Sequence, residues 1–139
     1  MILPPPSGKD QMMHTGRIVF AQLIDFLPMH EFRKCVRRYL GNRRMRTFSC
    51  MNQFLCRVFA QLTYCQSLRD IETCLRAMRD KLYHAGIRGQ VSRSILADAN
   101  ETRDWRIYAN FAQVLIGIAR KMYAQDEFGV AIKQTAYAF

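Results

Sequence analysis

The sequence contains few of the residues that break helices. Its 139 residues include only seven glycines and four prolines, and three of the prolines stand together at positions 4–6. Half of the residues are apolar, so the chain can form long regular elements and bury a core between them. This composition excludes a disordered or collagen-like polymer, and the length predicts one domain.

Motifs for metal, nucleotide or nucleophile chemistry are also missing. The five cysteines include no Cys-x-x-Cys pair, so we expect small buried side chains rather than a disulfide framework or a zinc finger. No glycine-rich phosphate loop and no Gly-x-Ser-x-Gly motif occurs. Asp98, Glu101 and Asp104 fall at a predicted helix junction, where acids typically cap helices. No cofactor and no metal are therefore expected.

Long apolar runs are absent from the sequence. The longest, at 18–21 and 111–119, are short or interrupted by Gln and Gly, whereas a bilayer span needs roughly 20 residues. The first ten residues have neither the basic segment nor the apolar segment of a secretory signal. We therefore expect a cytoplasmic protein that has no membrane partner.

Apolar residues recur with helical period in six segments, which predicts an all-α fold, a compact bundle of about six helices. Ser67 and Asp70 form a predicted capping box, and Gly41 and Gly86 are predicted helix ends. Only residues 130–139 have strand-like content, and they predict an orphan strand without a partner. The expected organisation is a disordered leader at 1–12 and a helical domain at 13–124. The predicted helices lie at 15–27, 29–40, 48–62, 68–85, 93–100 and 105–123.

Acidic residues are missing from the most basic part of the chain. The net charge is +10, and a surplus of this size favours a polyanionic partner, with nucleic acid the first candidate. Six of the seven cations in this stretch are arginines, which can hold a phosphate or a guanine edge with two hydrogen bonds. We therefore predict that it contacts double-stranded DNA, although a solvated helix face would also account for it. The predicted contact residues are Arg33, Lys34, Arg37, Arg38, Arg43, Arg44 and Arg46.

A second candidate contact lies further along the chain. Residues 82–100 combine a helix, a turn with two glycines and a short serine-capped helix, which are the proportions of a helix-turn-helix. In that geometry Arg88, Ser92, Arg93 and Ser94 would face phosphates or base edges. The two serines would alternatively serve only as helix caps.

Several ordered motifs carry a resemblance to a known family. They include VFAQLIDFLP at 19–28, FAQLT at 59–63, SLRDI at 67–71, LADANE at 96–101 and RDWRIY at 103–108. In order and spacing they resemble the amino-terminal region of bacterial DDE insertion-sequence transposases. There a small helical domain of unknown function precedes a ribonuclease-H-like domain whose three acids bind divalent metal.

The resemblance has implications for function and organisation. It implies a DNA-binding domain that acts in DNA transposition in a bacterial, nucleoid-associated setting. Residues 125–139 would begin a truncated catalytic domain without its acids, so this chain would be catalytically inactive and only a full-length transposase would need divalent metal. Alternatively, the region is an oligomerisation module that contacts another copy or an intact transposase through Phe48, Phe54, Trp105 and Tyr108.

Overall fold

The computed structural model describes residues 18–125, and these form seven helices and no strand. The predicted all-α class is confirmed for this part of the chain. The predicted leader at 1–12 and the predicted strand at 130–139 lie outside the described residues, as does nearly all of the 125–139 segment. The helices are α2 (Val19–Ile24), α3 (Met29–Arg38), α4 (Cys50–Leu62), α5 (Leu68–Ala77), α6 (Arg79–Tyr83), α7 (Arg93–Thr102) and α8 (Arg106–Tyr123).

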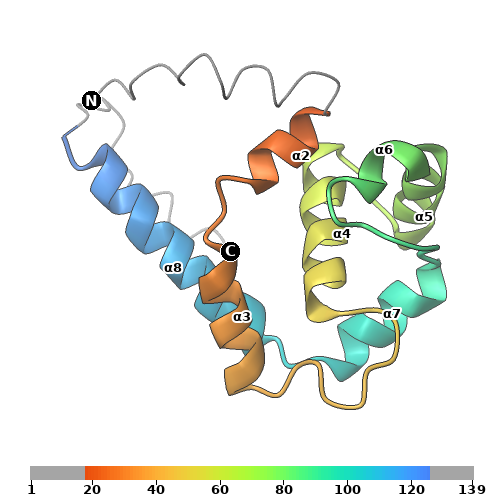
Figure 1. The fold of residues 1–139 in the computed structure, drawn as a ribbon, viewed down its shortest axis with the longest axis horizontal. Helices are drawn as coiled ribbons and strands as arrows, with labels where there is room; N and C mark the ends of the chain where they lie inside the picture. The colour runs from red at the N-terminus through yellow and green to blue at the C-terminus, as the bar shows by residue number, and fades with distance from the viewer. Residues whose placement is uncertain (1–17, 126–139) are drawn as a thin grey trace.

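Helix α4 is the central element of the fold. Figure 1 shows it between the pair α3 and α8 on one side and the group α5, α6 and α7 on the other. Each side has its own hydrophobic cluster, so the bundle has two cores rather than the single one expected. Met51 and Phe54 of α4 pack against both clusters and join them.

The cluster between α3, α4 and α8 is built on aromatic rings. Phe32, Phe54 and Phe111 form a triangle with ring centroids 5.0 to 5.3 Å apart. Phe32 and Phe111 are buried, as is Ile107 one turn before Phe111. Aromatic pairs at these separations stabilise a core beyond the area that they bury, so α3 is held firmly against α8.

Helix starts follow the predicted serine caps. The Ser67 Oγ accepts from the Asp70 N–H at 3.1 Å, and the Asp70 carboxylate accepts from the Ser67 N–H at 3.1 Å. This confirms the capping box at the start of α5. The Ser92 Oγ accepts from the Ile95 N–H at 3.3 Å, so Ser92, rather than Ser94, caps α7.

Helix ends differ from the predicted ones at several places: α2 ends at Ile24 rather than at residue 27, and α7 continues to Thr102 rather than ending at residue 100. The helix expected at 68–85 is interrupted at Met78, whose ψ of 13° leaves the helical range, so it becomes α5 and α6. The change of direction lets both Leu75 and Leu82 reach the same core. α3 ends at Arg38 rather than at residue 40, and Gly41 takes part in ending it, as predicted.

The end of α3 is a Schellman turn. The Gly41 N–H donates to the Val36 carbonyl at 2.9 Å, and the Leu40 N–H donates to the Arg37 carbonyl at 3.2 Å. Leu40, not glycine, occupies the left-handed position with a φ of 51°. Gly41 follows it because a side chain there would collide with Ile107 and Cys50.

No helix within residues 18–125 is both long enough and apolar enough to cross a bilayer.

Candidate nucleic-acid interface

The exposed face of α3 carries four cations. Phe32, Cys35 and Val36 are buried against α4 and α8. Because the helix turns once in 3.6 residues, the positions between these residues point away from the core. The four exposed cations are Arg33, Lys34, Arg37 and Arg38.

Only one cation of the basic run is paired with an acid in the described part of the chain. The Lys34 Nζ lies 2.7 Å from the Glu31 carboxylate, since Glu31 lies three residues, or about one helical turn, before Lys34. This ion pair also lowers the pKa of Glu31. Of the seven predicted contact residues, Lys34 is therefore paired with an acid that lies just before the run. Within residues 18–125, no side-chain hydrogen bond or ion pair engages Arg33, Arg37, Arg38, Arg43, Arg44 or Arg46.

The connection between α3 and α4, residues 39–49, is an ordered structure rather than a loose loop. The Arg43 N–H donates to the Leu40 carbonyl at 3.0 Å. The Asn42 side chain accepts from the Cys50 N–H at 3.0 Å, so it ties the connection to the start of α4. Arg44 adopts a left-handed φ of 63°. These bonds hold the connection in one path, and Arg43 and Arg44 project from it into solvent.

Two hollows lie on either side of this connection, and each brings two of the free arginines to a concave surface. The first has a volume of about 390 Å³, with Arg33 and Arg37 in its wall beside Ser49, the cap residue of α4. The positive end of the α4 dipole adds to the attraction for an anion there. The second, of about 300 Å³, is lined by Arg43 and Arg44 of the connection together with residues 102–104.

The second predicted contact differs from a helix-turn-helix. Residues 84–92 connect α6 to α7, whereas the motif has a turn of about three to four residues. Ala85, Ile87 and Val91 of this connection are buried, so it contributes to the core instead of making a tight turn. The sequence signal was misleading because its two glycines suggested a short turn.

The residues of this second contact lie away from the arginines of the first. Arg88 lies shortly before α7 and Arg93 is its first residue, and both are exposed, whereas Arg43 and Arg44 share a hollow with Thr102 at the end of α7. Ten helical residues, or roughly 15 Å, separate the two places. The Arg88 guanidinium lies 5.1 Å from the Tyr83 ring centroid. The hydroxyls of Ser92 and Ser94 lie 3.0 Å apart.

A buried polar network, which the sequence did not lead us to predict, connects α4 to α7, to α8 and to the α3–α4 connection. Gln53 of α4 is 1% exposed. It donates to the Asn100 side chain at 2.9 Å and accepts from Tyr108 and Arg103. Arg103 also donates to the carbonyl of Phe48, near the end of the basic connection. The sequence held one indication of this network, because Gln53 lies on the apolar face of a predicted helix. A glutamine on such a face is rarely buried without hydrogen-bond partners.

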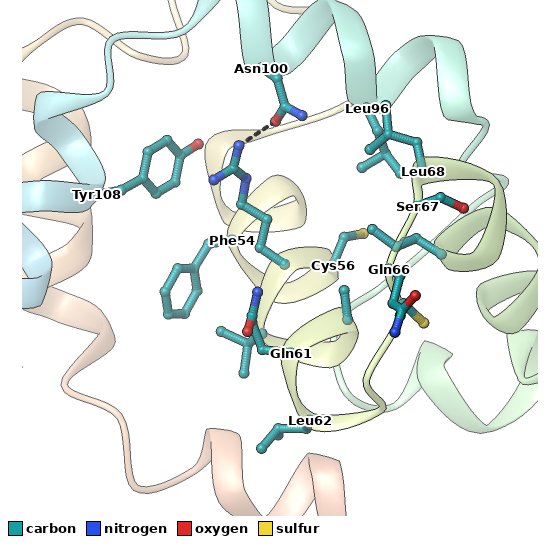
Figure 2. A pocket seen from close by; sticks show the side chains of 15 residues that line it. Phe54, Cys56, Gln61, Leu62, Gln66, Ser67, Leu68, Leu96, Asn100 and Tyr108 are labelled. Atoms are coloured by element: carbon teal, nitrogen blue, oxygen red, sulfur yellow. Dashed lines mark hydrogen bonds between the residues drawn. The ribbon is translucent and has the colours of Figure 1, made fainter. Parts of the chain in front are cut away.

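A groove opens between α4, the start of α5, α7 and α8. Figure 2 shows its side chains, and its volume is about 550 Å³. Its walls are mainly apolar, with Phe54, Leu68 and Leu96 among them. At one end Arg57 donates to the Asn100 side chain at 2.7 Å. No cation of the described residues other than Arg57 lines the groove, so it differs in character from the two basic hollows.

Asp104 and three of the five cysteines take the structural roles expected of them, whereas Asp98 and Glu101 are exposed on α7 and Cys65 and Cys74 are only partly buried. Asp104 forms an ion pair with Arg106 at 2.6 Å, which holds the pKa of the Asp104 carboxyl below its ordinary value. Cys35, Cys50 and Cys56 are buried, and all five cysteines are free. Burial raises the pKa of the Cys56 thiol to about 12. Among the described residues, no group of three or more His, Cys, Asp or Glu side chains could hold a metal ion.

One comparison with known proteins finds a match. A family model, described as a domain of unknown function (DUF4372), matches residues 15–88, which is more than half of the chain. The matched region contains the whole basic run and Arg88 but ends before α7 and α8. No curated protein and no solved structure matches the chain.

Proposed function

The chain belongs to the DUF4372 family, and on that premise we propose that it is a DNA-binding region of an insertion-sequence transposase. The observation that carries the proposal is the set of six free arginines on α3 and the α3–α4 connection. They lie on an ordered scaffold and no acid of the described residues neutralises them. Uncompensated arginine density is suited to binding phosphates.

The two hollows support contact with a DNA backbone in particular. Each presents two arginines without a partner among the described residues, and their planar guanidinium groups can donate paired hydrogen bonds to phosphate oxygens. Such contacts position a protein on DNA without reading its sequence. Arg88 and Arg93 would add backbone contacts at the other end of α7. The resemblance of the sequence motifs to transposases supplies the biological setting of the proposal.

The proposal is tested by the salt dependence of binding to a fluorescent DNA duplex between about 50 mM and about 200 mM salt. We expect affinity to fall steeply, because phosphate contacts release counterions. Arg43→Gln, Arg44→Gln and Arg46→Gln should each weaken binding and reduce the slope of log K against log salt by roughly one.

The matched control is Arg76→Gln, which removes the same charge from α5, where Arg76 is already paired with Glu72 at 3.2 Å. It should leave the slope nearly unchanged. Equal effects of Arg43→Gln and Arg76→Gln would show that only net charge matters and would contradict a defined interface.

We assign no strand cleavage to this chain, and metal-dependent nicking of supercoiled DNA would contradict that assignment.

A second candidate function, an oligomerisation module, is favoured by the exposed end of α8. Ile116, Ile118 and Met122 are each at least 41% exposed there. The surface expected for this role is largely internal, because Phe54 packs in the core, Phe48 and Tyr108 are half-buried and only Trp105 is mostly exposed. Light scattering separates the two functions: a concentration-dependent dimer that ignores DNA would favour the module.

A further inference from the structure

Trp105, the only tryptophan of the chain, immediately follows in sequence residues 102–104, which line the second basic hollow. Its side chain is 72% exposed. It directly follows Asp104, which lines the hollow together with Arg43 and Arg44. It directly precedes Arg106, whose guanidinium lies 4.7 Å from the ring centroid of Tyr39, another lining residue.

The corner that carries Trp105 is held in place on both sides. Arg103 is anchored to the Phe48 carbonyl and to Gln53. Arg106 binds both carboxylate oxygens of Asp104, with nitrogen to oxygen distances of 2.6 to 3.1 Å. Binding at such a preorganised corner costs little backbone entropy.

The chemistry of the corner fits a nucleotide whose base is not paired. Arginines attract the phosphate, and an exposed indole offers a face on which any base can stack. Inside a duplex both base faces are covered by neighbouring pairs, so the indole can stack on an unpaired base but not on an internal paired one. An apolar protein partner fits less well, because it would have to remove water from Arg43 and Arg44 without pairing them.

We propose that the hollow between residues 39–45 and 102–104 receives an unpaired nucleotide, with its phosphate on Arg43 and Arg44 and its base stacked on Trp105. This inference rests on the proposed DNA-binding function and names the substrate class of that site. The volume of about 300 Å³ is at the lower limit of small-molecule sites, which span about 300–1,000 Å³, so one nucleotide rather than several would enter.

The fluorescence of Trp105 provides a direct test, since no other tryptophan contributes. The probes are a blunt duplex, the same duplex with a short 3′ overhang of thymidines, and inorganic polyphosphate. The overhang duplex should quench the emission strongly, because a stacked base quenches an indole. The blunt duplex and the polyphosphate should quench it weakly. Equal quenching by all three probes would overturn the proposal.

Affinity measured with labelled DNA gives an independent result. Trp105→Ala should weaken binding of the overhang duplex by about 5- to 140-fold and leave the blunt duplex nearly unchanged, and Trp105→Phe should restore part of the loss. Tyr64→Ala is the matched control, since Tyr64 is 89% exposed but lies on the α4–α5 connection. Far-ultraviolet circular dichroism verifies that each variant is folded.

The possible failures are distinguishable. If Trp105→Ala binds both duplexes as the parent does, while binding remains steeply salt-dependent, the nucleotide site is wrong and the proposed function stands. If no DNA is bound at any salt concentration, the proposed function fails as well. If Trp105→Ala instead abolishes a dimer seen by light scattering, Trp105 is a protein contact and the nucleotide site is overturned.

Discussion

At the scale of single residues, Gly41 shows how closely α3 and α8 approach. A Cβ atom at this position would lie 2.5 Å from the Ile107 Cδ1 and 2.7 Å from the Cys50 Sγ. Both neighbours are fully buried and have no room to move. Gly41→Ala should therefore lower the free energy of unfolding by about 1–3 kcal/mol through overpacking, as measured by urea denaturation.

Gly117 of α8 is the matched control for this substitution, because a Cβ atom at Gly117 would meet no described atom within 4 Å. Alanine is the better helix former in a helix interior, so Gly117→Ala should raise the stability by up to about 1 kcal/mol. The same substitution thus has opposite signs at the two glycines. Equal effects would show that backbone freedom, not close packing, is the reason for Gly41.

Because the Cys56 thiol is buried, we expect the protein to lose stability at alkaline pH. Burial raises the pKa of its thiol to about 12 in the folded chain, whereas an unfolded cysteine ionises near about 8.5. The unfolded state therefore loses its proton first, and the stability falls as the pH rises between these two values. The contribution of the protonated Cys56 thiol to the free energy of unfolding is fully present below about pH 8.5. Above that pH the free energy of unfolding falls by about 1.4 kcal/mol per pH unit. Urea unfolding at about pH 8 and about pH 10 should show a smaller fall in Cys56→Ala than in the parent.

At the scale of elements, the network around Gln53 fastens α4 to the ends of α7 and α8. Gln53→Leu keeps nearly the same volume but leaves Asn100, Arg103 and Tyr108 without the partner that Gln53 provides. The expected loss is about 1–3 kcal/mol for polar groups buried without hydrogen bonds. Gln61→Leu, two turns later on an exposed part of α4, should change the stability by less than about 0.5 kcal/mol. Thermal or urea unfolding compares the two, and similar losses would contradict a structural role for the network.

At the scale of the whole molecule, α4 makes the two hydrophobic clusters depend on one another. Met51 and Phe54 belong to the packing of both, so neither side can lose its core without exposing residues of the other. We therefore expect one cooperative unfolding transition. Trp105 fluorescence reports on the α3–α8 side, whereas circular dichroism reports on all helices, and the two melting curves should coincide. Separate midpoints would show that the two sides unfold independently.

Local rules in the sequence predicted most of the helices and one part of the site. The serine at position 67 and the acid three residues later identify the start of α5, because a cap needs only neighbouring atoms. The exposed cations of α3 follow from helical period alone. The resemblance to transposases likewise depends on ordered motifs and requires no coordinates.

What the sequence by itself determined is therefore what neighbours along the chain decide: helical class, caps and the sign of the charge at residues 33–46. Only the tertiary structure decided that Gly41 packs closely against Ile107 and Cys50, that Gln53 joins three helices, and that Asp104, the residue before Trp105, shares a hollow with Arg43 and Arg44. Each of these depends on residues tens of positions apart coming into contact. Helical period specifies which face of a segment is buried but not which other helix covers it.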